Sequence, residues 1–515
     1  MEPNLHLVQT LQSPEPAPNL LDPAWVGARV LVVGLGESGL AMATWLGRCG
    51  AQVSVVDTRE QASEKQALLS QVPQAQVVQS AFSDYALDQV DLLAWSPGVS
   101  IELGEGAKLY QRARDLNLSV LGELDLFLSA IKSQEAAHYR PKLIGVTGTN
   151  GKTTVTALCA HLCLAANCKA QAAGNIGPAM LDAWMQCLEA MPEQALPQVW
   201  VLELSSFQMA LANLNAENKL FDVATVLNLS QDHLDWHLSM ASYEAAKRKL
   251  LHASKVQVLA SGDAWVSEQR VNFGPSAPTA IGDFGLIQEG PLLWLAAGTA
   301  GEELPSRRRA APIVALINKR LMPAQALHIH GQHNQLNVLA ALALCRAVGL
   351  PLHALLHGLR DYRGESHRCE LISIIDGVEF IDDSKGTNVG ATVAGVLGLA
   401  KPSHLILGGE GKGQDFSPLV APVTQYAKSV MLIGRDAKLV GEALAKTGVE
   451  QVFCESLEQA VTLATQRATS GQAVLLSPAC ASFDMFKSYV HRGQVFQALV
   501  RQLAADKGQE LEVTQ

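Results

Sequence analysis

A glycine-rich segment at residues 145–154 carries the strongest chemical signal in this chain of 515 residues. It reads Gly-Val-Thr-Gly-Thr-Asn-Gly-Lys-Thr-Thr, follows an apolar run and opens a helical stretch. Small residues let backbone N–H groups surround phosphate oxygens, and the positive end of the helix dipole adds to the attraction. We expect Lys152 to reach the β- and γ-phosphates and the Thr153 hydroxyl to hold Mg²⁺. The segment therefore predicts a site for a nucleoside triphosphate rather than a turn that binds nothing.

A second glycine-rich turn lies near the N-terminus, where Gly34, Gly36 and Gly39 follow an apolar run. The next apolar run ends in Asp57, so the segment has the pattern of a dinucleotide-binding βαβ unit. A pyrophosphate can approach such a turn closely, and Asp57 is placed to bond a ribose or a base edge. This unit alone leaves open a nicotinamide-dependent dehydrogenase, or a Rossmann-like fold without a ligand. The stronger phosphate loop downstream weighs against the dehydrogenase, since nothing after it specifies hydride transfer.

Side chains that suit a metal ion follow the expected strands of the central region. Glu203 ends the apolar run 199–203, and parallel strands gather ligands at their carboxyl ends, so we expect its carboxylate to hold Mg²⁺. An inert glutamate buried there without a partner would be costly. His233 lies between Asp232 and Asp235 at a strand-to-loop junction, which favours metal binding or phosphate contact over a purely structural histidine.

The elements that position these residues are predicted by apolar runs that alternate with helical periodicity, a pattern typical of parallel α/β folds. The chain is too long for one core, so we expect three α/β domains, each with a mostly parallel sheet. These are a Rossmann-like N-terminal domain, a central P-loop ATPase domain and a Rossmann-like C-terminal domain. Their expected bounds are 29–139, 140–364 and 365–515, after a flexible leader over 1–28.

Short apolar runs mark the individual strands. Strands are expected at residues 29–33, 52–57, 92–95, 119–121, 142–146, 199–203, 223–228, 380–382, 404–407, 430–433 and 473–476. A helix is expected over 334–344. The region 271–323 is rich in glycine and proline and poorly periodic, so β-hairpins or an insertion are expected there.

Composition excludes several classes of protein. A net charge of −10 argues against a general nucleic-acid binder, because phosphate backbones require clustered lysine and arginine. No apolar run approaches the roughly 20 residues that span a bilayer, and the first residues lack the basic start of a signal peptide. The nine cysteines are scattered without CxxC pairs, so reduced thiols are expected. We therefore expect a cytoplasmic, monomeric protein.

The phosphate loop also points to a particular family. Val146 stands where the general P-loop pattern has glycine, and residues 147–153, Thr-Gly-Thr-Asn-Gly-Lys-Thr, resemble the loop of the Mur ligase family. Members of that family couple ATP cleavage to amide-bond formation. The resemblance covers nearly the whole chain, with its motifs in order. It implies ATP and two Mg²⁺ ions as cofactors.

The resemblance also implies which residues hold the two nucleotides. The ATP positions are Gly148, Thr149, Asn150, Gly151, Lys152, Thr153, Thr154, Asn334, Asn337, Arg368 and Asp383. In the family the first glycine turn holds a uridine diphosphate. The positions for that substrate are Glu37, Ser38, Asp57, Thr58, Arg59, Ser96, Pro97, Gly98 and Asn175.

Residues 243–249, Tyr-Glu-Ala-Ala-Lys-Arg-Lys, read on their own as an amphipathic helix with exposed lysines. The resemblance reverses this interpretation for Lys247, because the family carries there a lysine carbamylated by CO₂ whose carboxylate helps to hold the second Mg²⁺. A lysine partly desolvated near metal would have a lowered pKa and a free amine that reacts with CO₂. The implied metal positions are Thr153, Glu203, His233 and Lys247, and the implied catalytic positions are Lys152, His233 and Lys247.

The last third of the chain holds the positions for the incoming amino acid. Residues 383–387 and 477–484 resemble the motifs of the branch that adds D-glutamate to UDP-N-acetylmuramoyl-L-alanine, which implies these two substrates. We expect a helix to open at Ser482 and to receive a carboxylate at its N-terminus. The implied D-glutamate positions are Lys385, Thr387, Lys412, Ser482 and Tyr489.

The resemblance thus implies an ATP-dependent ligase of peptidoglycan precursor synthesis. ATP would convert the substrate carboxylate to an acyl phosphate, and the amine of D-glutamate would then attack it. Closure of the third block onto the second is expected to assemble the site. The alternatives are another amino-acid-adding ligase of this family and, outside it, a nicotinamide-dependent oxidoreductase or a nonenzymatic nucleotide sensor.

Overall fold

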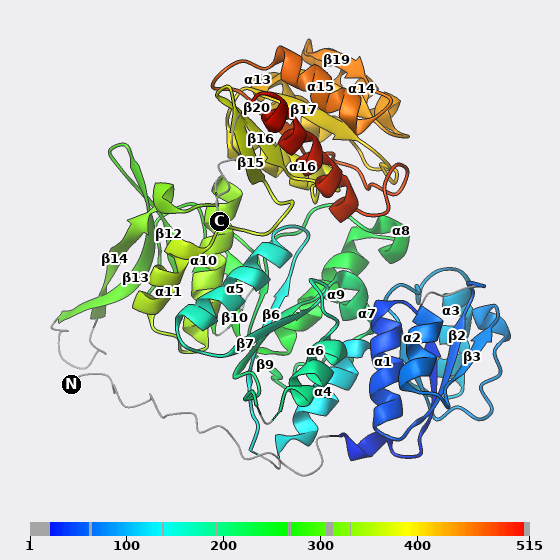
Figure 1. Cartoon of the computed structure of the whole chain (residues 1–515). Coiled ribbons are helices and arrows are strands. Elements are labelled where there is room, and N and C mark those ends of the chain that lie inside the picture. Colours follow the sequence, from blue (N-terminus) through cyan, green and yellow to red (C-terminus); the bar gives the residue numbers. More distant parts are fainter. Residues whose placement is uncertain are drawn as a thin grey trace. The chain divides into compact units, whose positions relative to one another are not determined.

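The computed structural model describes residues 21–508 except 61–63, 136–137, 192, 266, 268, 305–312 and 330 (Figure 1). The expected leader over 1–28 lies outside the described residues as far as residue 20. The chain divides into two compact units. The first runs to Phe273 and includes Gly282–Phe284 and Ala340–Gly358, and the second comprises Gly274–Ile281, Gly285–Leu339 and the chain from Leu359.

The N-terminal sheet of the first unit is a parallel, doubly wound sheet with the strand order β3-β2-β1-β4-β5 (blue in Figure 1). Its strands are β1 (Arg29–Val33), β2 (Gln52–Asp57), β3 (Gln76–Gln79), β4 (Leu92–Trp95) and β5 (Ser119–Leu121). The helices are α1 (Glu37–Arg48), α2 (Glu64–Gln71), α3 (Gly104–Asp115) and α4 (Glu123–Ser133). The four expected strands are confirmed. The carboxyl ends of β1, β2 and β4 lie at one edge, where the first glycine turn follows β1.

The central sheet of the first unit is also parallel, with the order β11-β10-β9-β6-β8-β7. Its strands are β6 (Lys142–Thr147), β7 (Ala170–Gly174), β8 (Val199–Glu203), β9 (Phe221–Val226), β10 (Ser254–Ala260) and β11 (Arg270–Phe273). The helices are α5 (Lys152–Ala165), α6 (Met180–Glu189), α7 (Ser206–Leu211), α8 (Leu234–His237) and α9 (Met240–His252). Because β6 lies between β8 and β9, the loops after all three strands emerge together at one edge.

One apolar core joins the two sheets of the first unit. Trp45 of α1, Phe127 of α4 and Trp184 of α6 belong to the same buried cluster, together with Trp200 of β8. The rings of Phe127 and Trp200 pack edge to face with centroids 5.0 Å apart. This shared core fixes the first glycine turn and the phosphate loop within one body.

The second unit begins with the region expected to contain hairpins. After β12 (Phe284–Glu289), strands β13 (Leu292–Leu304) and β14 (Ile313–Pro323) pair antiparallel, which confirms that expectation. Helix α10 (Gln332–Ala347) contains the expected helix 334–344, and α11 (Leu352–Asp361) follows it; residues 340–358 of these two helices belong to the first unit.

The third sheet has the order β15-β16-β20-β17-β18-β19 and is parallel except for β15, which pairs antiparallel with β16. Its strands are β15 (Glu370–Ile375), β16 (Val378–Asp382), β17 (Ser403–Gly408), β18 (Ala427–Ile433), β19 (Glu450–Phe453) and β20 (Ala473–Leu476). The helices are α12 (Val389–Leu399), α13 (Val420–Tyr426), α14 (Ala437–Leu444), α15 (Leu457–Arg467) and α16 (Tyr489–Asp506), the last drawn in red in Figure 1. The expected class, three mostly parallel α/β domains, is confirmed.

The prediction that a helix opens at Ser482 is wrong. Ser482 forms a turn in which its carbonyl accepts the Phe486 N–H at 2.8 Å, and α16 begins only at Tyr489. The physical reason is the cap, because the Ser488 side chain accepts the His491 N–H and so satisfies a donor of the first turn.

The structure bears on two expectations that concern the whole sequence. All nine cysteines are free thiols, as expected. Among the helices that the structure describes, none combines the length and apolarity needed to cross a bilayer.

Candidate nucleotide and ligase site

The phosphate loop between β6 and α5 is shaped by two glycines with positive φ. Gly148 has φ 151° and Gly151 has φ 83°, a region that side chains rarely adopt. Asn228, which follows β9, holds the loop from outside. Its Oδ1 accepts the Asn150 N–H at 2.9 Å, and its Nδ2 donates to the Asn150 carbonyl at 3.0 Å. The loop is therefore preorganised at the N-terminus of α5, where an anion is favoured.

Two lysines converge on one carbonyl of this loop. Lys152 Nζ donates to the carbonyl oxygen of Gly148 at 3.1 Å, and Lys247 Nζ donates to the same oxygen at 2.8 Å. Lys247 also lies 3.3 Å from Thr147 Oγ1 and 4.7 Å from the centroid of the Tyr243 ring. The positive charge of Lys152 so close by disfavours a second charge on Lys247 and favours an anion at the loop.

Lys247 is buried, with 1% of its surface exposed, so the amphipathic interpretation with exposed lysines is wrong at this position. Burial and the charge of Lys152 lower the pKa of Lys247 well below its ordinary value, against the opposing pull of Asp232 and Glu203. Its neighbour Lys249 instead bonds the carbonyls of Ala210 and Ala212.

Glu203 ends β8 and has 1% of its surface exposed. Its Oε1 accepts the Asn175 Nδ2–H at 2.7 Å, while its buried Oε2 has no hydrogen-bond partner among the described residues. A buried carboxylate oxygen without a partner is costly, and a divalent cation would satisfy it. The residues at this edge therefore fit Mg²⁺.

His233 follows β9 at the same edge of the sheet. Its backbone has φ 53°, its side chain is 41% exposed, and its Nε2 lies 3.5 Å from Asp232 Oδ2. The ring packs edge-on against Phe207 with centroids 4.6 Å apart. The side chain of Asp235 lies outside the described residues.

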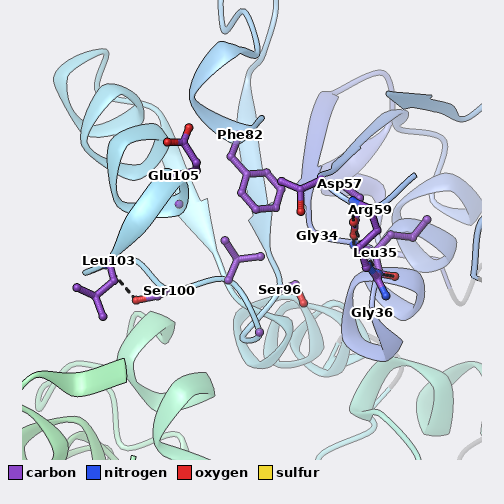
Figure 2. A pocket seen from close by; sticks show the side chains of 14 residues that line it. Gly34, Leu35, Gly36, Asp57, Arg59, Phe82, Ser96, Ser100, Leu103 and Glu105 are labelled. Atoms are coloured by element: carbon purple, nitrogen blue, oxygen red, sulfur yellow. Dashed lines mark hydrogen bonds and ion pairs between the residues drawn. The ribbon is translucent and has the colours of Figure 1, made fainter. Parts of the chain in front are cut away.

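The first glycine turn borders a cavity of about 520 Å³ (Figure 2). Figure 2 shows Asp57 and Arg59 on one side of this cavity and Ser100, Leu103 and Glu105 on the other. The expected substrate residues that line it are Asp57, Thr58, Arg59, Ser96 and Gly98, whereas Glu37, Ser38 and Pro97 are not among its lining. Sequence reasoning missed Phe82, Ser100, Leu103 and Glu105, which carry no motif.

Asp57 and Arg59 form a closed pair at this turn. The Asp57 carboxylate accepts the Leu35 N–H at 2.7 Å, the Arg59 N–H at 2.8 Å and the Arg59 Nη2–H at 3.0 Å. Arg59 Nη2 also donates to the Leu35 carbonyl at 2.6 Å. Burial works against the charge of Asp57, but the bonds from Arg59 and Leu35 outweigh it and hold its pKa below the ordinary value.

Glu123, at the start of α4, is a buried acid that sequence reasoning missed. Its Oε1 accepts the Leu181 N–H at 3.1 Å, and its buried Oε2 has no hydrogen-bond partner among the described residues. Burial raises the pKa of Glu123 to about 7, although a hydrogen bond with Ser38 opposes the shift. Glu123 thus links the start of α4 to the N-terminus of α6.

In the second unit, Asp383 follows β16 and is buried. Its Oδ2 accepts the Ser477 Oγ–H at 2.6 Å and its Oδ1 accepts the Cys369 N–H at 3.3 Å. Burial raises the pKa of Asp383 to about 7, against the opposing hydrogen bond from Ser477 and the charge of Arg368. On α10, Asn337 Nδ2 donates to Asn334 Oδ1 at 3.1 Å, so these two expected adenine residues form one pair.

The expected D-glutamate residues fall into two groups of contacts. Lys385 Nζ lies 3.8 Å from the centroid of the Tyr489 ring, which brings the loop after β16 to the start of α16. Lys412 Nζ lies 6.0 Å from the Phe483 ring, next to the buried Ser482. Cations beside accessible loops suit a ligand with two carboxylates.

Comparison with protein families finds matches along most of the chain. Residues 28–121 match the Mur ligase MurD-like N-terminal domain, residues 146–345 the Mur ligase middle domain, and residues 367–480 the Mur ligase glutamate ligase domain. The UDP-N-acetylmuramoylalanine–D-glutamate ligase of Ralstonia nicotianae is 51% identical over 93% of this chain and 98% of its own. The ligase of the same name from Burkholderia mallei is 49% identical over 94% of this chain and 98% of its own.

Solved structures share the fold at low identity. The UDP-N-acetylmuramate–alanine ligase of Thermotoga maritima has a TM-score of 0.55 and 19% identity, covering 93% of this chain and 99% of its own. The MurF ligase of Thermotoga maritima, solved in complex with ADP, has a TM-score of 0.55 and 14% identity, covering 95% and 97%.

Proposed function

The chain belongs to the Mur ligase family, and we propose that it is an ATP-dependent ligase that joins D-glutamate to UDP-N-acetylmuramoyl-L-alanine in peptidoglycan precursor synthesis. Relatives of about half-identical sequence over nearly the full length carry this activity in their names. The observation that carries the proposal is the phosphate loop, where Lys152 and Lys247 both donate to the Gly148 carbonyl, together with Glu203 Oε2 at the end of the neighbouring strand β8, which has no hydrogen-bond partner in the part of the chain that the structure describes. This arrangement suits phosphoryl transfer, in which charge neutralisation supplies most of the catalysis.

The reaction proceeds in two steps. A carboxylate oxygen of UDP-N-acetylmuramoyl-L-alanine attacks the γ-phosphorus of ATP, and ADP leaves. The amine of D-glutamate then attacks the acyl carbon, inorganic phosphate leaves, and the nitrogen loses a proton to complete the amide. Lys152 stabilises charge on the transferring phosphoryl group from the N-terminus of α5. His233 orients the substrate or the metal shell.

The family uses ATP and Mg²⁺. When bound, Mg²⁺ neutralises phosphate charge and polarises the phosphoryl oxygens. We propose two ions, held by Thr153, Glu203, His233 and Lys247. The neutral amine of Lys247 attacks CO₂, forms a C–N bond and releases a proton, which converts the amine into a carbamate with hard oxygen ligands. The low pKa of Lys247 supports this step, because it supplies the free amine.

The remaining expected residues fall into three groups, one for each of the three ligands. The loop residues Gly148, Thr149, Asn150, Gly151 and Thr154 bind the phosphates of ATP. Asn334 and Asn337 lie near the adenine and a phosphate, Arg368 meets a phosphate or a developing charge, and Asp383 binds the ribose. The uridine nucleotide occupies the cavity of Figure 2 and is bound by the residues of the first glycine turn. Asn175, which is not among the residues that line this cavity, is a further ligand of the same substrate. Lys385, Thr387, Lys412, Ser482 and Tyr489 bind the two carboxylates of D-glutamate. We further propose domain bounds at 29–139, 140–364 and 365–515 and a monomer that acts in the cytoplasm, where ATP is available.

Phosphate release from ATP tests the proposal, with UDP-N-acetylmuramoyl-L-alanine, Mg²⁺, bicarbonate and one of four amino acids: D-glutamate, L-glutamate, L-alanine or meso-diaminopimelate. Release that depends on D-glutamate alone is expected. Release with another amino acid would keep the ligase chemistry and change the branch. No release with any of them, from folded protein, would overturn the proposal.

A further inference from the structure

Arg492, in the first turns of α16, is a fully buried cation that the reaction scheme above does not use. Only 1% of its surface is exposed. Its Nε donates to Ser384 Oγ at 3.1 Å and its Nη2 to the Ser384 carbonyl at 2.8 Å, while its Nη1 donates to the Cys480 carbonyl at 3.2 Å. One guanidinium thus joins the loop after β16 to the loop after β20.

The charge of Arg492 is retained despite its burial. Burial lowers the pKa of Arg492 to about 10, against the pull of Cys480, Asp484, Asp382 and Asp383, so the group stays protonated at neutral pH. Its three hydrogen bonds all end on neutral oxygens. Burying a cation among neutral oxygens costs free energy. The planar guanidinium of arginine offsets part of this cost, because it donates several hydrogen bonds in fixed directions.

The same face of α16 holds the loop after β16 at further points. Ser384 Oγ donates to the Tyr489 carbonyl at 2.8 Å, and the Lys385 ammonium lies over the Tyr489 ring. Gly493 permits α16 to lie close to the end of β16, because a Cβ there would lie 2.9 Å from Asp382 Oδ2. The loop that carries Lys385 is therefore held by α16 in addition to its own bonds, among them the Ser384 N–H to Asp382 Oδ1 at 2.9 Å and the Gly386 N–H to the Asp383 carbonyl at 2.8 Å.

We propose that Arg492 is a positioning residue that sets the D-glutamate pocket, by fixing the loop of Lys385 and Thr387 relative to the loop of Ser482. The inference rests on the proposed function, which places D-glutamate between these loops. Arg492 itself does not touch the amino acid. It acts through Ser384 and Cys480, each of which lies within two residues of a proposed D-glutamate ligand.

The adenosine end of the same loop has its own supports. The Asp383 N–H donates to the Leu476 carbonyl at 2.8 Å, and the Asp383 side chain accepts bonds from Ser477 and Cys369. Arg492 makes none of these bonds. A change at Arg492 should therefore alter the KM for D-glutamate while leaving the KM for ATP nearly unchanged.

The test compares Arg492→Lys with the matched control Arg501→Lys, an exposed position on the same helix. Lysine keeps the charge but cannot reach both loops with directed bonds. Steady-state phosphate release should give a KM for D-glutamate raised about tenfold or more in Arg492→Lys, since losing bonds of roughly 1.4 kcal/mol corresponds to tenfold. The KM for ATP and for the uridine substrate should stay within about twofold of wild type.

A second variant, Ser384→Ala, tests the same proposal in case Arg492→Lys fails to fold. Ser384→Ala removes one anchor and leaves Arg492 in place, and it should raise the KM for D-glutamate by about threefold, consistent with one modest hydrogen bond. Acyl phosphate formed without D-glutamate, trapped by borohydride reduction, should persist in both variants. An unchanged KM for D-glutamate in Arg492→Lys, or a parallel rise in the KM for ATP, would overturn the positioning role. Phosphate release by the wild-type protein that does not depend on D-glutamate would overturn the proposed function instead.

Discussion

The two glycine-rich turns of the first unit resemble each other in sequence but treat charge in opposite ways. At the first turn, the carboxylate of Asp57 is bonded by Arg59 and by the Leu35 N–H, so its charge is neutralised within the chain. At the phosphate loop, two lysines share the carbonyl of Gly148, and a carboxylate oxygen of Glu203 has no hydrogen-bond partner among the described residues.

The two turns therefore differ in how far each needs a ligand to balance its charges. The first turn can receive a uridine diphosphate with little rearrangement of charge. The second places Lys247 beside the charge of Lys152, which favours its neutral amine, and leaves a buried oxygen of Glu203 without a hydrogen-bond partner among the described residues, a cost that a bound cation relieves. We infer that the phosphate loop is completed by ATP, by Mg²⁺ and by CO₂ on Lys247, whereas the first turn is complete in the chain itself.

The largest effect should follow removal of the loop lysine. Lys152→Ala should lower phosphate release about 1,000-fold or more, because it removes the cation that stabilises the transferring phosphoryl group. Lys142→Ala, at the opposite end of β6, is the control and should retain activity. The melting temperatures of both variants should match wild type. Substantial turnover in Lys152→Ala would contradict the role of the phosphate loop in phosphoryl transfer.

Lys247→Ala should come next, with activity lower by about 100-fold, because a metal ligand is lost. Added formate or acetate should restore part of the activity by supplying a carboxylate in the vacated space. Lys249→Ala, two residues along α9, should be insensitive to these additives. Full activity in Lys247→Ala without any additive would contradict the role as a metal ligand.

A smaller change is expected at the first turn. Arg59→Met should raise the KM for the uridine substrate about tenfold and leave kcat nearly unchanged, since the pair contributes to binding rather than to chemistry. Arg29→Met removes an exposed ion pair with Asp91 at the other end of β1 and serves as the control. A drop in kcat without a change in KM would show that the first turn takes part in the chemical step.

The smallest effect concerns stability near the first turn. The pKa of Glu123 is about 7 in the folded chain, above its ordinary value of 4.5. Between these values the folded state binds the proton more tightly than the unfolded state, so the free energy of unfolding falls as pH rises from about 4.5 to 7, by roughly 3 kcal/mol at most.

Glu123→Gln keeps the shape and removes this titration, so its melting temperature should decline less than that of wild type between pH 5 and pH 7.5. Asp383→Asn is the comparison in the second unit, where a carboxyl group with a pKa of about 7 is also buried. Identical pH profiles for wild type and Glu123→Gln would contradict a buried, titrating Glu123.

Much of this architecture could be predicted from the sequence, because apolar runs mark buried strands and glycines mark the two turns. Strand β3, Gln-Val-Val-Gln, escaped prediction because it is short and mostly exposed. The error at Ser482 arose because a serine before an apolar stretch can cap a helix, but Ser488 caps it instead. Glu123 and Arg492 could not be predicted, since their partners lie far away in the sequence. Arg492 bonds Ser384 at a separation of 108 residues.

Carbon-13 NMR of the protein in labelled bicarbonate is the decisive measurement for a carboxylate that the phosphate loop gains from CO₂ at Lys247. Carbamylation should give a carbamate signal in wild type that strengthens with Mg²⁺, persists in Lys249→Ala and vanishes in Lys247→Ala. A fully active wild-type protein without such a signal, or a signal that survives in Lys247→Ala, would contradict carbamylation at Lys247.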